Sequence, residues 1–390
     1  MANPSALSPT PAPRGAYAPR WIEREAEFFA LRQQWNALVD AAPRRHVFLR
    51  HEWFDAAWAW RQRDAQLALL CVFDADDLVG VAPLIVESVQ TARIPLRRLA
   101  LLSVPDTQFA DIVLAADNRE AIATTMAAAI AARRGWDQLA VSHLPDSALA
   151  IRYLLPALTG AGVAATREHF GENPLIDLSG EWEAFYATRG RRLKKSNNLT
   201  ANRISKVGKP EIEWLHGRAD EPVRAQWQAD LLRISAASWK ETTGLTLDNP
   251  GPQAFATRLL SHAAEAGWLS LWRLSLDGVA IATEFQLDYD GDIFALRADY
   301  DQAQRELSAG SYLNWKLLEQ MFAADLKRYY LGPGGNAYKA RWTETAEALD
   351  QIVAFNRTVR GRLAKAIEIL RPLARRLRAR LRRKQEQENA

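Results

Sequence analysis

Cysteine is nearly absent from this sequence, with one residue, Cys71, in a chain of 390. A single cysteine excludes a disulfide within the chain, and its position in the apolar run LALLCVF predicts a buried structural thiol. Histidine is also scarce, and the six histidines show no paired spacing with carboxylates or cysteines that is typical of a metal site. We therefore expect no metal and no requirement for an oxidising compartment.

Long hydrophobic runs are missing as well. No segment approaches the roughly 18 uninterrupted apolar residues that a transmembrane helix needs. The Pro- and Ala-rich start has no apolar run of signal-peptide length, so we expect a disordered leader over residues 1–20 and a cytoplasmic protein. Apolar residues still make up 48% of the chain, which is ample for a core, and 390 residues favour two folded units.

One order of elements occurs twice along the chain. Helical spacing in EFFALRQQWNALVD and HEWFDAAWAWRQ is followed by strand-like runs, an Ala-rich helix and the strand WDQLAVSHL. Later, a helix around AQWQADLLRISAASWK is followed by three strands with tight turns at Asp277-Gly278 and Asp290-Gly291, and then by a helix over residues 311–323. The pattern predicts an α/β (α+β) fold of two halves, residues 21–170 and 171–356, each a mixed, mostly antiparallel sheet flanked by helices.

The end of the chain, residues 357–390, is strongly basic, with 12 Lys or Arg against 3 Glu. Its apolar residues recur at helical spacing, which predicts an amphipathic helix with one apolar stripe: Leu363, Ile367, Leu370, Ala374, Leu377 and Leu381. Such a helix suits an anionic membrane surface, and a coiled coil or a docking helix fits the same stripe. Nucleic acid is not expected as a partner, because no aromatic residues interleave with the charges.

The stretch RELSAGSYLNWKLLEQMF follows three strands and begins a long helix. This is the element order of the GNAT acyltransferase core, and four segments make the resemblance specific: SWKETTGL (238–245), GVAIATEFQLDYDGDIFALRADYD (278–301), SAGSYLNWKLLEQMF and GPGGNAYKARW (332–342). Together they resemble the CelD/BcsL family of GNAT-related acyltransferases, including its bacterial ceramide synthase-like members. The resemblance covers residues 170–345 sharply and the first half more weakly.

The resemblance implies that acyl-CoA is a co-substrate and that no cofactor is permanently bound. It places the phosphates of CoA at the N-terminus of the helix, where free N–H groups and the helix dipole favour anions. The residues expected there are Arg305, Ser308, Ala309, Gly310 and Ser311. Gly310 is the single glycine of this loop, which keeps open a scaffold that has the fold without donor binding.

Acyl transfer to an amine needs a base, an oxyanion donor and an acid for the leaving thiolate. Glu284, within IATEFQL, is a candidate base or a carboxylate on a solvated face. Asp299 and Tyr300 end the next strand, and Tyr338 and Lys339 follow a later one. The tyrosines are candidates for protonating the thiolate or for core packing, and Lys339 for contacting a phosphate or the substrate or for an exposed cap.

Acceptor binding is expected at residues of both halves. Asp106, Asp111 and His143 belong to the first half, where the two acidic residues also fit loop capping and the histidine also fits a structural role. Trp239 and Lys240 match the WK element of the family. A basic run over residues 189–209 is either a solvated helix face or a contact for anionic lipid, a phosphorylated acceptor or the 3′-phosphate of CoA.

These features predict an enzyme, an acyl-CoA-dependent N-acyltransferase, on the cytoplasmic side and peripheral on the inner membrane. It would move an acyl group from acyl-CoA or acyl carrier protein to an amine on a sphingoid-base-like lipid or an envelope glycan precursor. Two alternatives are a Fem-like transferase that uses aminoacyl-tRNA and a non-catalytic scaffold in polysaccharide or lipid assembly.

Overall fold

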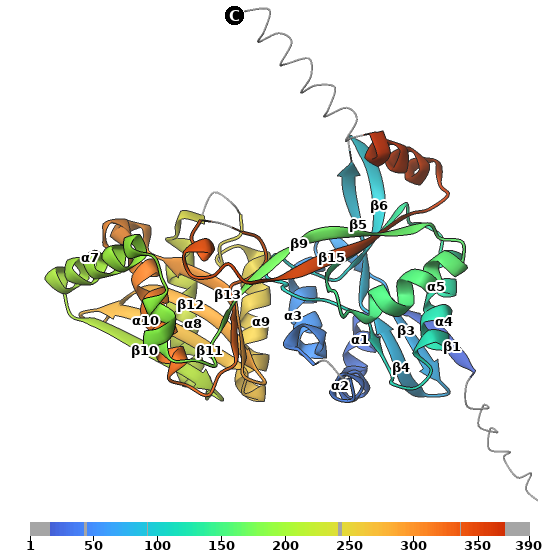
Figure 1. The fold of residues 1–390 in the computed structure, drawn as a ribbon. Helices are drawn as coiled ribbons and strands as arrows, with labels where there is room; N and C mark the ends of the chain where they lie inside the picture. The colour runs from blue at the N-terminus through green and yellow to red at the C-terminus, as the bar shows by residue number, and fades with distance from the viewer. Residues whose placement is uncertain (1–15, 43–44, 92, 241–243, 336, 371–390) are drawn as a thin grey trace, which may run out of the picture.

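A computed structural model of the chain describes residues 16–42, 45–91, 93–240, 244–335 and 337–370. Two lobes lie side by side, and two long strands run between them (Figure 1). The elements of the first half are, in chain order, β1 (Tyr17–Ile22), α1 (Glu25–Ala30), α2 (Arg32–Asp40), η1 (Val47–Leu49), α3 (His51–Arg61), β2 (Ala65–Leu67), β3 (Leu69–Asp74), β4 (Asp77–Ala82), β5 (Leu84–Thr91), β6 (Ile94–Leu101), β7 (Val113–Leu114), α4 (Arg119–Ala132), β8 (Gln138–Pro145), η2 (Ala150–Leu154) and α5 (Leu155–Gly160).

The second half follows without a break. Its elements are β9 (Ala165–Asp177), α6 (Trp182–Ala187), α7 (Arg191–Val207), β10 (Pro210–Gly217), α8 (Glu221–Ala236), α9 (Pro250–Ala266), β11 (Leu269–Leu276), β12 (Val279–Tyr289), β13 (Asp292–Tyr300), η4 (Gln302–Leu307), α10 (Ala309–Phe322), β14 (Arg328–Tyr330), η5 (Lys339–Arg341) and β15 (Ala346–Phe355). A further helix covers residues 359–370.

One mixed sheet of eleven strands, in the order β10-β11-β12-β13-β14-β9-β15-β8-β6-β5-β2, runs through both halves, and β1, β3, β4 and β7 form a separate sheet. Strand β15 pairs with β8 of the first half on one side and with β9 on the other. The last strand of the second half therefore completes the sheet of the first, and β9 and β15 are the strands that join the lobes in Figure 1.

Helix α3 lies between the lobes and packs against α9. Residues 51–59 of α3 are all buried, including Trp53 and Phe54. A helix that is buried on nearly all sides needs packing partners on nearly all sides, and its place between the two lobes supplies them. The tryptophans of HEWFDAAWAWR thus form a core shared by the two halves.

Several sequence expectations differ from the structure. The expected disordered leader over residues 1–20 extends too far, because Tyr17–Ile22 forms strand β1, which pairs antiparallel with β3. Residues 1–15 lie outside the described part of the chain. The boundary expected between residues 170 and 171 falls inside β9. This strand, ATREHFGENPLID, has no apolar alternation over much of its length and is held by its two neighbours, β14 and β15.

Candidate active site

Strands β13 and β14 separate after a short parallel pairing. They pair at three positions, ending with Phe294 and Tyr330. Beyond these, β13 stays with β12 as far as Tyr300, whereas the N–H of Leu331 donates to the carbonyl of Pro174 on β9 at 2.9 Å. A cavity of about 410 Å³ lies at this separation.

Most of the residues that the sequence predicts for catalysis, donor binding or acceptor binding meet in this cavity. The lining includes nine of them: Trp239, Lys240, Glu284, Asp299, Tyr300, Gly310, Ser311, Tyr338 and Lys339. They come from β12, β13, the start of α10 and the segments that follow α8 and β14. Residues that are 100 positions apart in the sequence are thus brought to one place by the sheet.

A β-bulge reshapes β13 at the cavity. Phe285 of β12 is opposite Arg297, but the next residue, Gln286, is opposite Ala295, so Leu296 is an extra residue in β13. The carbonyl of Ala295 accepts a hydrogen bond of 2.7 Å from Nε2 of Gln108, in the first half. A bulge re-aims side chains and ends regular pairing, and here a side chain from the other half satisfies the backbone carbonyl that faces the gap.

The cavity opens to both faces of the sheet. Glu284 is opposite Ala298, and its neighbour in the strand, Thr283, is opposite Asp299. Because successive residues of a strand point to opposite faces, Glu284 faces α10 and Thr283 faces α8 and α9. Both residues line the cavity, which therefore passes through the sheet where β13 and β14 separate.

Glu284 is the centre of a buried hydrogen-bond network on the α10 face. Its Oε1 accepts a bond from the hydroxyl of Tyr329 and one of 2.8 Å from Nε2 of Gln286. The Oε1 of Gln286 in turn accepts from the Trp272 indole at 3.1 Å and from the Ser270 hydroxyl at 3.0 Å. This chain of donors fixes the orientation of the carboxylate toward the cavity.

The side chain of Glu284 has the electrostatics expected of a base. The residue is 2% exposed, so it does not lie on a solvated face. Burial raises its pKa above the ordinary value for a glutamate, and hydrogen bonds from Tyr329, Gln286 and Asn314 offset only part of that rise. A carboxylate with a raised pKa in a cavity accepts a proton more readily than an exposed one.

Helix α10 points its N-terminus at the cavity. Ser308, the N-cap, has a left-handed backbone (φ 53°) and its side chain makes no capping hydrogen bond. The first N–H groups of a helix have no partner within the helix, so that of Gly310, which lines the cavity, is available to an anion. Gly310 lies against Tyr300, because a Cβ at this glycine would be 3.2 Å from Cδ1 of the ring.

The residues expected around this helix start divide into two groups. Gly310 and Ser311 line the cavity, whereas Ala309 is fully buried beneath it. Arg305 does not line the cavity: its side chain is 67% exposed and lies 3.6 Å from the carboxylate of Glu306.

Tyr338 and Lys339 close the cavity from the segment after β14. Burial, followed by the nearby negative charge of Glu284, raises the pKa of Tyr338 well above its ordinary value, so this phenol keeps its proton. The ammonium of Lys339 donates to three carbonyls, those of Gly332 at 2.6 Å, Pro333 at 3.2 Å and Gly334 at 3.0 Å. Burial lowers the pKa of Lys339 to about 8. Lys339 thus clamps the loop that borders the cavity.

Asp106 does not line the cavity but forms an ion pair with Arg297, which does. The two side chains form a bidentate ion pair, with Nη2 to Oδ2 at 2.6 Å and Nε to Oδ1 at 2.5 Å, and both are almost completely buried. Arg297 lines the cavity and also donates to the carbonyl of Leu245 at 2.5 Å. A carboxylate of the first half therefore holds a guanidinium of the second half at the wall of the site.

The other two residues expected in the first half lie elsewhere. Both carboxylate oxygens of Asp111 accept backbone N–H groups, from Leu149 at 2.6 Å and from Ala150 at 2.8 Å, so Asp111 caps the turn η2. The ring of His143 packs on Phe170 at 4.4 Å, and burial lowers the pKa of His143 to about 4. Neither residue lines the cavity at β13 and β14.

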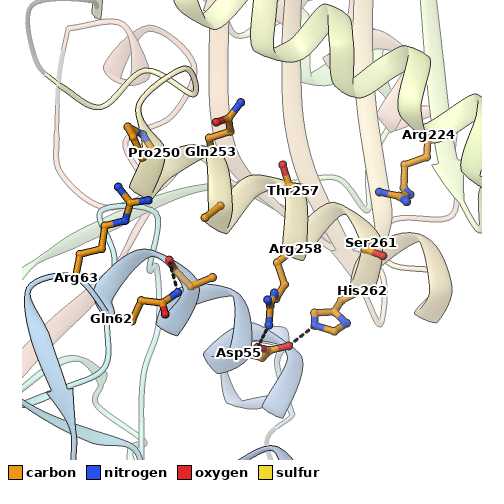
Figure 2. A pocket seen from close by; sticks show the side chains of 12 residues that line it. Asp55, Gln62, Arg63, Arg224, Pro250, Gln253, Thr257, Arg258, Ser261 and His262 are labelled. Carbon is orange, nitrogen blue, oxygen red and sulfur yellow. Dashed lines mark hydrogen bonds and ion pairs between the residues drawn. The ribbon is translucent and has the colours of Figure 1, made fainter. Parts of the chain in front are cut away.

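A second, more open hollow of about 720 Å³ lies between α3 and α9 (Figure 2). Asp55 accepts hydrogen bonds of 2.7 Å from both Arg258 and His262, which join the two helices. Burial acts to raise the pKa of Asp55, but these two partners outweigh it and the net effect is a lowered pKa. The hollow is larger than the cavity described above, yet its central charged groups are bonded to one another. We therefore interpret this hollow as part of the interface between the two halves.

Four buried polar residues of the cavity were not anticipated from the sequence: Thr283, Arg297, Asn314 and Tyr329. Asn314 lies on the apolar face of α10, three residues before Leu317, and a polar residue in that stripe is a signal that the sequence contains. Gln286 alternates with Glu284 within an apolar strand, which is a similar signal. Tyr329 gives no such signal, because its partner is 45 residues away.

No group of three or more His, Cys, Asp or Glu side chains in the described residues is arranged to hold a metal ion. Among the helices that the structure describes, none is long and apolar enough to cross a membrane.

Comparison with known proteins gives one family match. Residues 192–340 match the model of the acetyltransferase (GNAT) domain. No curated protein matches the sequence. The GNAT prediction is confirmed for this part of the chain, and the CelD/BcsL family stays a prediction.

Solved structures resemble the fold over most of the chain. They include the C-terminal DUF2156 domain of an Agrobacterium fabrum protein assigned as a lysylphosphatidylglycerol synthetase (13% identity, 88% of this chain and 97% of that one, TM-score 0.51) and FemX (12%, 86% and 98%, 0.51). A conserved protein of unknown function from Bacteroides thetaiotaomicron is similar to the same degree (12%, 86% and 99%, TM-score 0.50). At these identities the likeness shows the fold alone, and it confirms the predicted mixed α/β class.

Proposed function

We propose that this protein is an N-acyltransferase that moves an acyl group from an acyl-CoA or acyl-carrier-protein thioester to a primary amine. The observation that carries the proposal is the cavity through the sheet, with the N-terminus of α10 at its border and the buried carboxylate of Glu284 in its wall. The two faces of the sheet give a donor and an acceptor separate approaches to one point.

The chemistry follows from the groups that line the cavity. Glu284 takes a proton from the ammonium of the acceptor, and the resulting amine attacks the thioester carbonyl. A C–N bond forms, the tetrahedral intermediate collapses, and the C–S bond breaks, while the second proton of the attacking nitrogen replaces the proton that a phenol gives to the sulfur. Tyr338 or Tyr329 holds its proton because its pKa is raised well above the ordinary value, so either phenol is able to donate it to the leaving thiolate.

The donor site is assigned to the α10 face. The N–H of Gly310 at the helix start suits a phosphate oxygen, and the absence of a side chain at Gly310 leaves room for it next to Tyr300. Arg305 and Ser308 do not line the cavity but lie next to the helix start in the sequence, and the exposed guanidinium of Arg305 is able to turn toward a phosphate, because its contact with Glu306 is 3.6 Å and open to solvent.

The acceptor is assigned to amine-bearing lipids of the sphingoid-base type, or to envelope glycan precursors. The helix at residues 359–370 supports an interfacial substrate: Val359 is 83% exposed, Leu363 50% and Leu370 56%, on a helix that also carries Arg360, Arg362 and Lys365. Exposed apolar residues beside cations are typical of helices that lie on anionic membranes. These residues support a peripheral location on the inner face of the membrane.

A melting-temperature screen tests the donor assignment. The purified protein is heated with CoA, acetyl-CoA and palmitoyl-CoA, and a ligand at 100 times its dissociation constant stabilises it by about 2.7 kcal/mol. Gly310→Glu should abolish the shift by placing a carboxylate where the phosphates bind, and Gln320→Glu, an exposed position of the same helix, should leave it unchanged.

Two alternatives give other results in this screen. Helix α7 has six Lys or Arg and no acidic residue, which also suits the RNA of an aminoacyl-tRNA donor. In that case aminoacyl-tRNA would bind and CoA thioesters would not. A non-catalytic scaffold would respond to neither donor. A shift in Gly310→Glu equal to that of the unmodified protein would remove the phosphate assignment.

A further inference from the structure

Lys240 and Asp299 form an ion pair on the face of the cavity opposite α10. The Lys240 ammonium is 2.9 Å from Oδ1 of Asp299 and donates a hydrogen bond of 2.9 Å to the carbonyl of Ala298. The Asp299 side chain is fully buried within β13, whereas that of Lys240 is 22% exposed. The anion is therefore built into the sheet, and the cation reaches it from the surface on a flexible stem.

Several buried polar atoms of this site have no hydrogen-bond partner among the described residues. Among the described residues, none gives Oδ2 of Asp299 a hydrogen bond, and the Lys240 ammonium meets Oδ1 without the alignment of one. The hydroxyl of Thr283, opposite Asp299 in the ladder and 4% exposed, also has no partner there. Buried polar atoms are costly without partners, so the site is short of donors.

We propose that Asp299, the carbonyl of Ala298 and the hydroxyl of Thr283 bind the ammonium group of a primary-amine acceptor, and that the Lys240 ammonium occupies this position until the acceptor displaces it. The inference rests on the proposed function, which it deepens by locating the acceptor. In the absence of an acceptor, the Lys240 ammonium would thus take the place of the substrate ammonium.

The chemistry of the exchange favours amines over alcohols. A primary ammonium carries three N–H donors, which match a carboxylate, a carbonyl and a hydroxyl. Replacing one ammonium by another keeps the buried Asp299 paired throughout. A neutral hydroxyl acceptor would leave this carboxylate buried without a cation, which is strongly unfavourable.

The position also couples to the base. The positive charge of Lys240 acts on Glu284 across the strand and lowers its pKa, against the larger effect of burial. An acceptor ammonium in the same place would likewise favour the ionised form of Glu284. Binding of the acceptor ammonium would thus favour the ionised Glu284 that removes its proton.

The test uses the full-length protein, Lys240→Gln and the double variant Lys240→Gln/Asp299→Asn. The glutamine keeps a donor near Ala298 and Asp299 but removes the charge. Lys316→Gln is the matched control, because Lys316 pairs with Glu319 at 2.7 Å on α10 and does not line the cavity. The probe is n-butylammonium chloride, with n-butanol and tetramethylammonium chloride at equal ionic strength for comparison, and the readout is the melting temperature.

We expect saturable stabilisation of Lys240→Gln by butylammonium alone, with a half-maximal concentration at least about tenfold lower than for the unmodified protein, whose own tethered ammonium competes. The double variant should show no such response, and Lys316→Gln should behave as the unmodified protein. An unresponsive Lys240→Gln, or a double variant that responds equally, would overturn the proposal. So would failure of Lys240→Gln to fold while Lys240→Arg folds, because the cation would then be a permanent structural partner.

Each protein is also melted with palmitoyl-CoA. A thioester shift without an ammonium response would refute the acceptor site and leave the donor site in place. If palmitoyl-CoA does not raise the melting temperature of the unmodified protein, that result would instead count against the proposed function.

Discussion

Replacing Glu284 by glutamine separates the chemical role of this residue from its structural one. Of the three hydrogen bonds to Glu284, those from Tyr329 and Gln286 end on the same oxygen, Oε1, and the third comes from Asn314. The carbonyl of a glutamine is able to accept both, so the local packing is kept. The variant removes the ionisable group and keeps an acceptor for these two bonds.

The expected loss of activity is large. A positioned general base contributes roughly 10²- to 10⁴-fold to a rate, so kcat should fall by that factor, whereas the dissociation constant for the donor should change little. In the unmodified enzyme, kcat/KM should rise with pH through the raised pKa of Glu284, because only the ionised carboxylate accepts a proton. The variant should lack this rise.

The stability of the unmodified protein should depend on pH through Glu284, whereas that of Glu284→Gln should not. Because the pKa of Glu284 is raised in the folded state, the folded protein binds the proton more tightly than the unfolded chain. Its contribution to stability is complete below the unfolded pKa and is lost as the pH rises through the folded pKa. Each pKa unit corresponds to about 1.4 kcal/mol, so Glu284→Gln should be the more stable protein at alkaline pH, with the advantage shrinking on acidification.

The assays are steady-state kinetics and thermal melts across pH, with Glu347→Gln as the control. Glu347 accepts a bond of 3.3 Å from Tyr330 and does not line the cavity. Its substitution should leave kcat unchanged. If kcat of Glu284→Gln stays within twofold of the unmodified enzyme and the stability difference does not vary with pH, Glu284 is neither the base nor a strongly perturbed carboxylate.

Three further predictions follow from the other buried and exposed groups. Asp106→Asn should lower the free energy of unfolding by about 3–5 kcal/mol, because it leaves the buried Arg297 without its carboxylate partner. The control, Asp290→Asn, loses an exposed contact of 3.7 Å to Arg45 and should change the free energy of unfolding by under about 0.5 kcal/mol. Equal losses of stability in the two variants would contradict this prediction. Leu363→Glu combined with Leu370→Glu should weaken binding to anionic vesicles at least about tenfold in a sedimentation assay, and undiminished binding would exclude this helix as the membrane contact. Burial raises the pKa of Cys71 to about 12, so the native protein should not react with a disulfide reagent at pH 8 but should do so in denaturant; rapid native reaction would show an accessible thiol.

Some parts of this protein follow from short stretches of the chain. The turns at Asp277-Gly278 and Asp290-Gly291 have positive φ at all four residues, as the Asp-Gly pairs predict, because the hairpin geometry is local. Helix α10 begins two residues before its expected start, since its apolar spacing and small N-terminal residues are local signals too. The GNAT match over residues 192–340 lies within the part of the chain where the motifs had indicated it.

The site itself depends on contacts that no short segment contains. Arg297 meets Asp106 across 191 residues, and Gln108 meets Ala295 across 187, so the wall of the cavity exists only once both halves have packed. Strand β9 has a polar sequence and becomes a strand because β14 and β15 flank it. Sequence determined which residue types were available for acyl transfer. The separation of β13 and β14 decided which of them meet, because side-chain pairing across a sheet depends on register and bulges that form only with the whole fold.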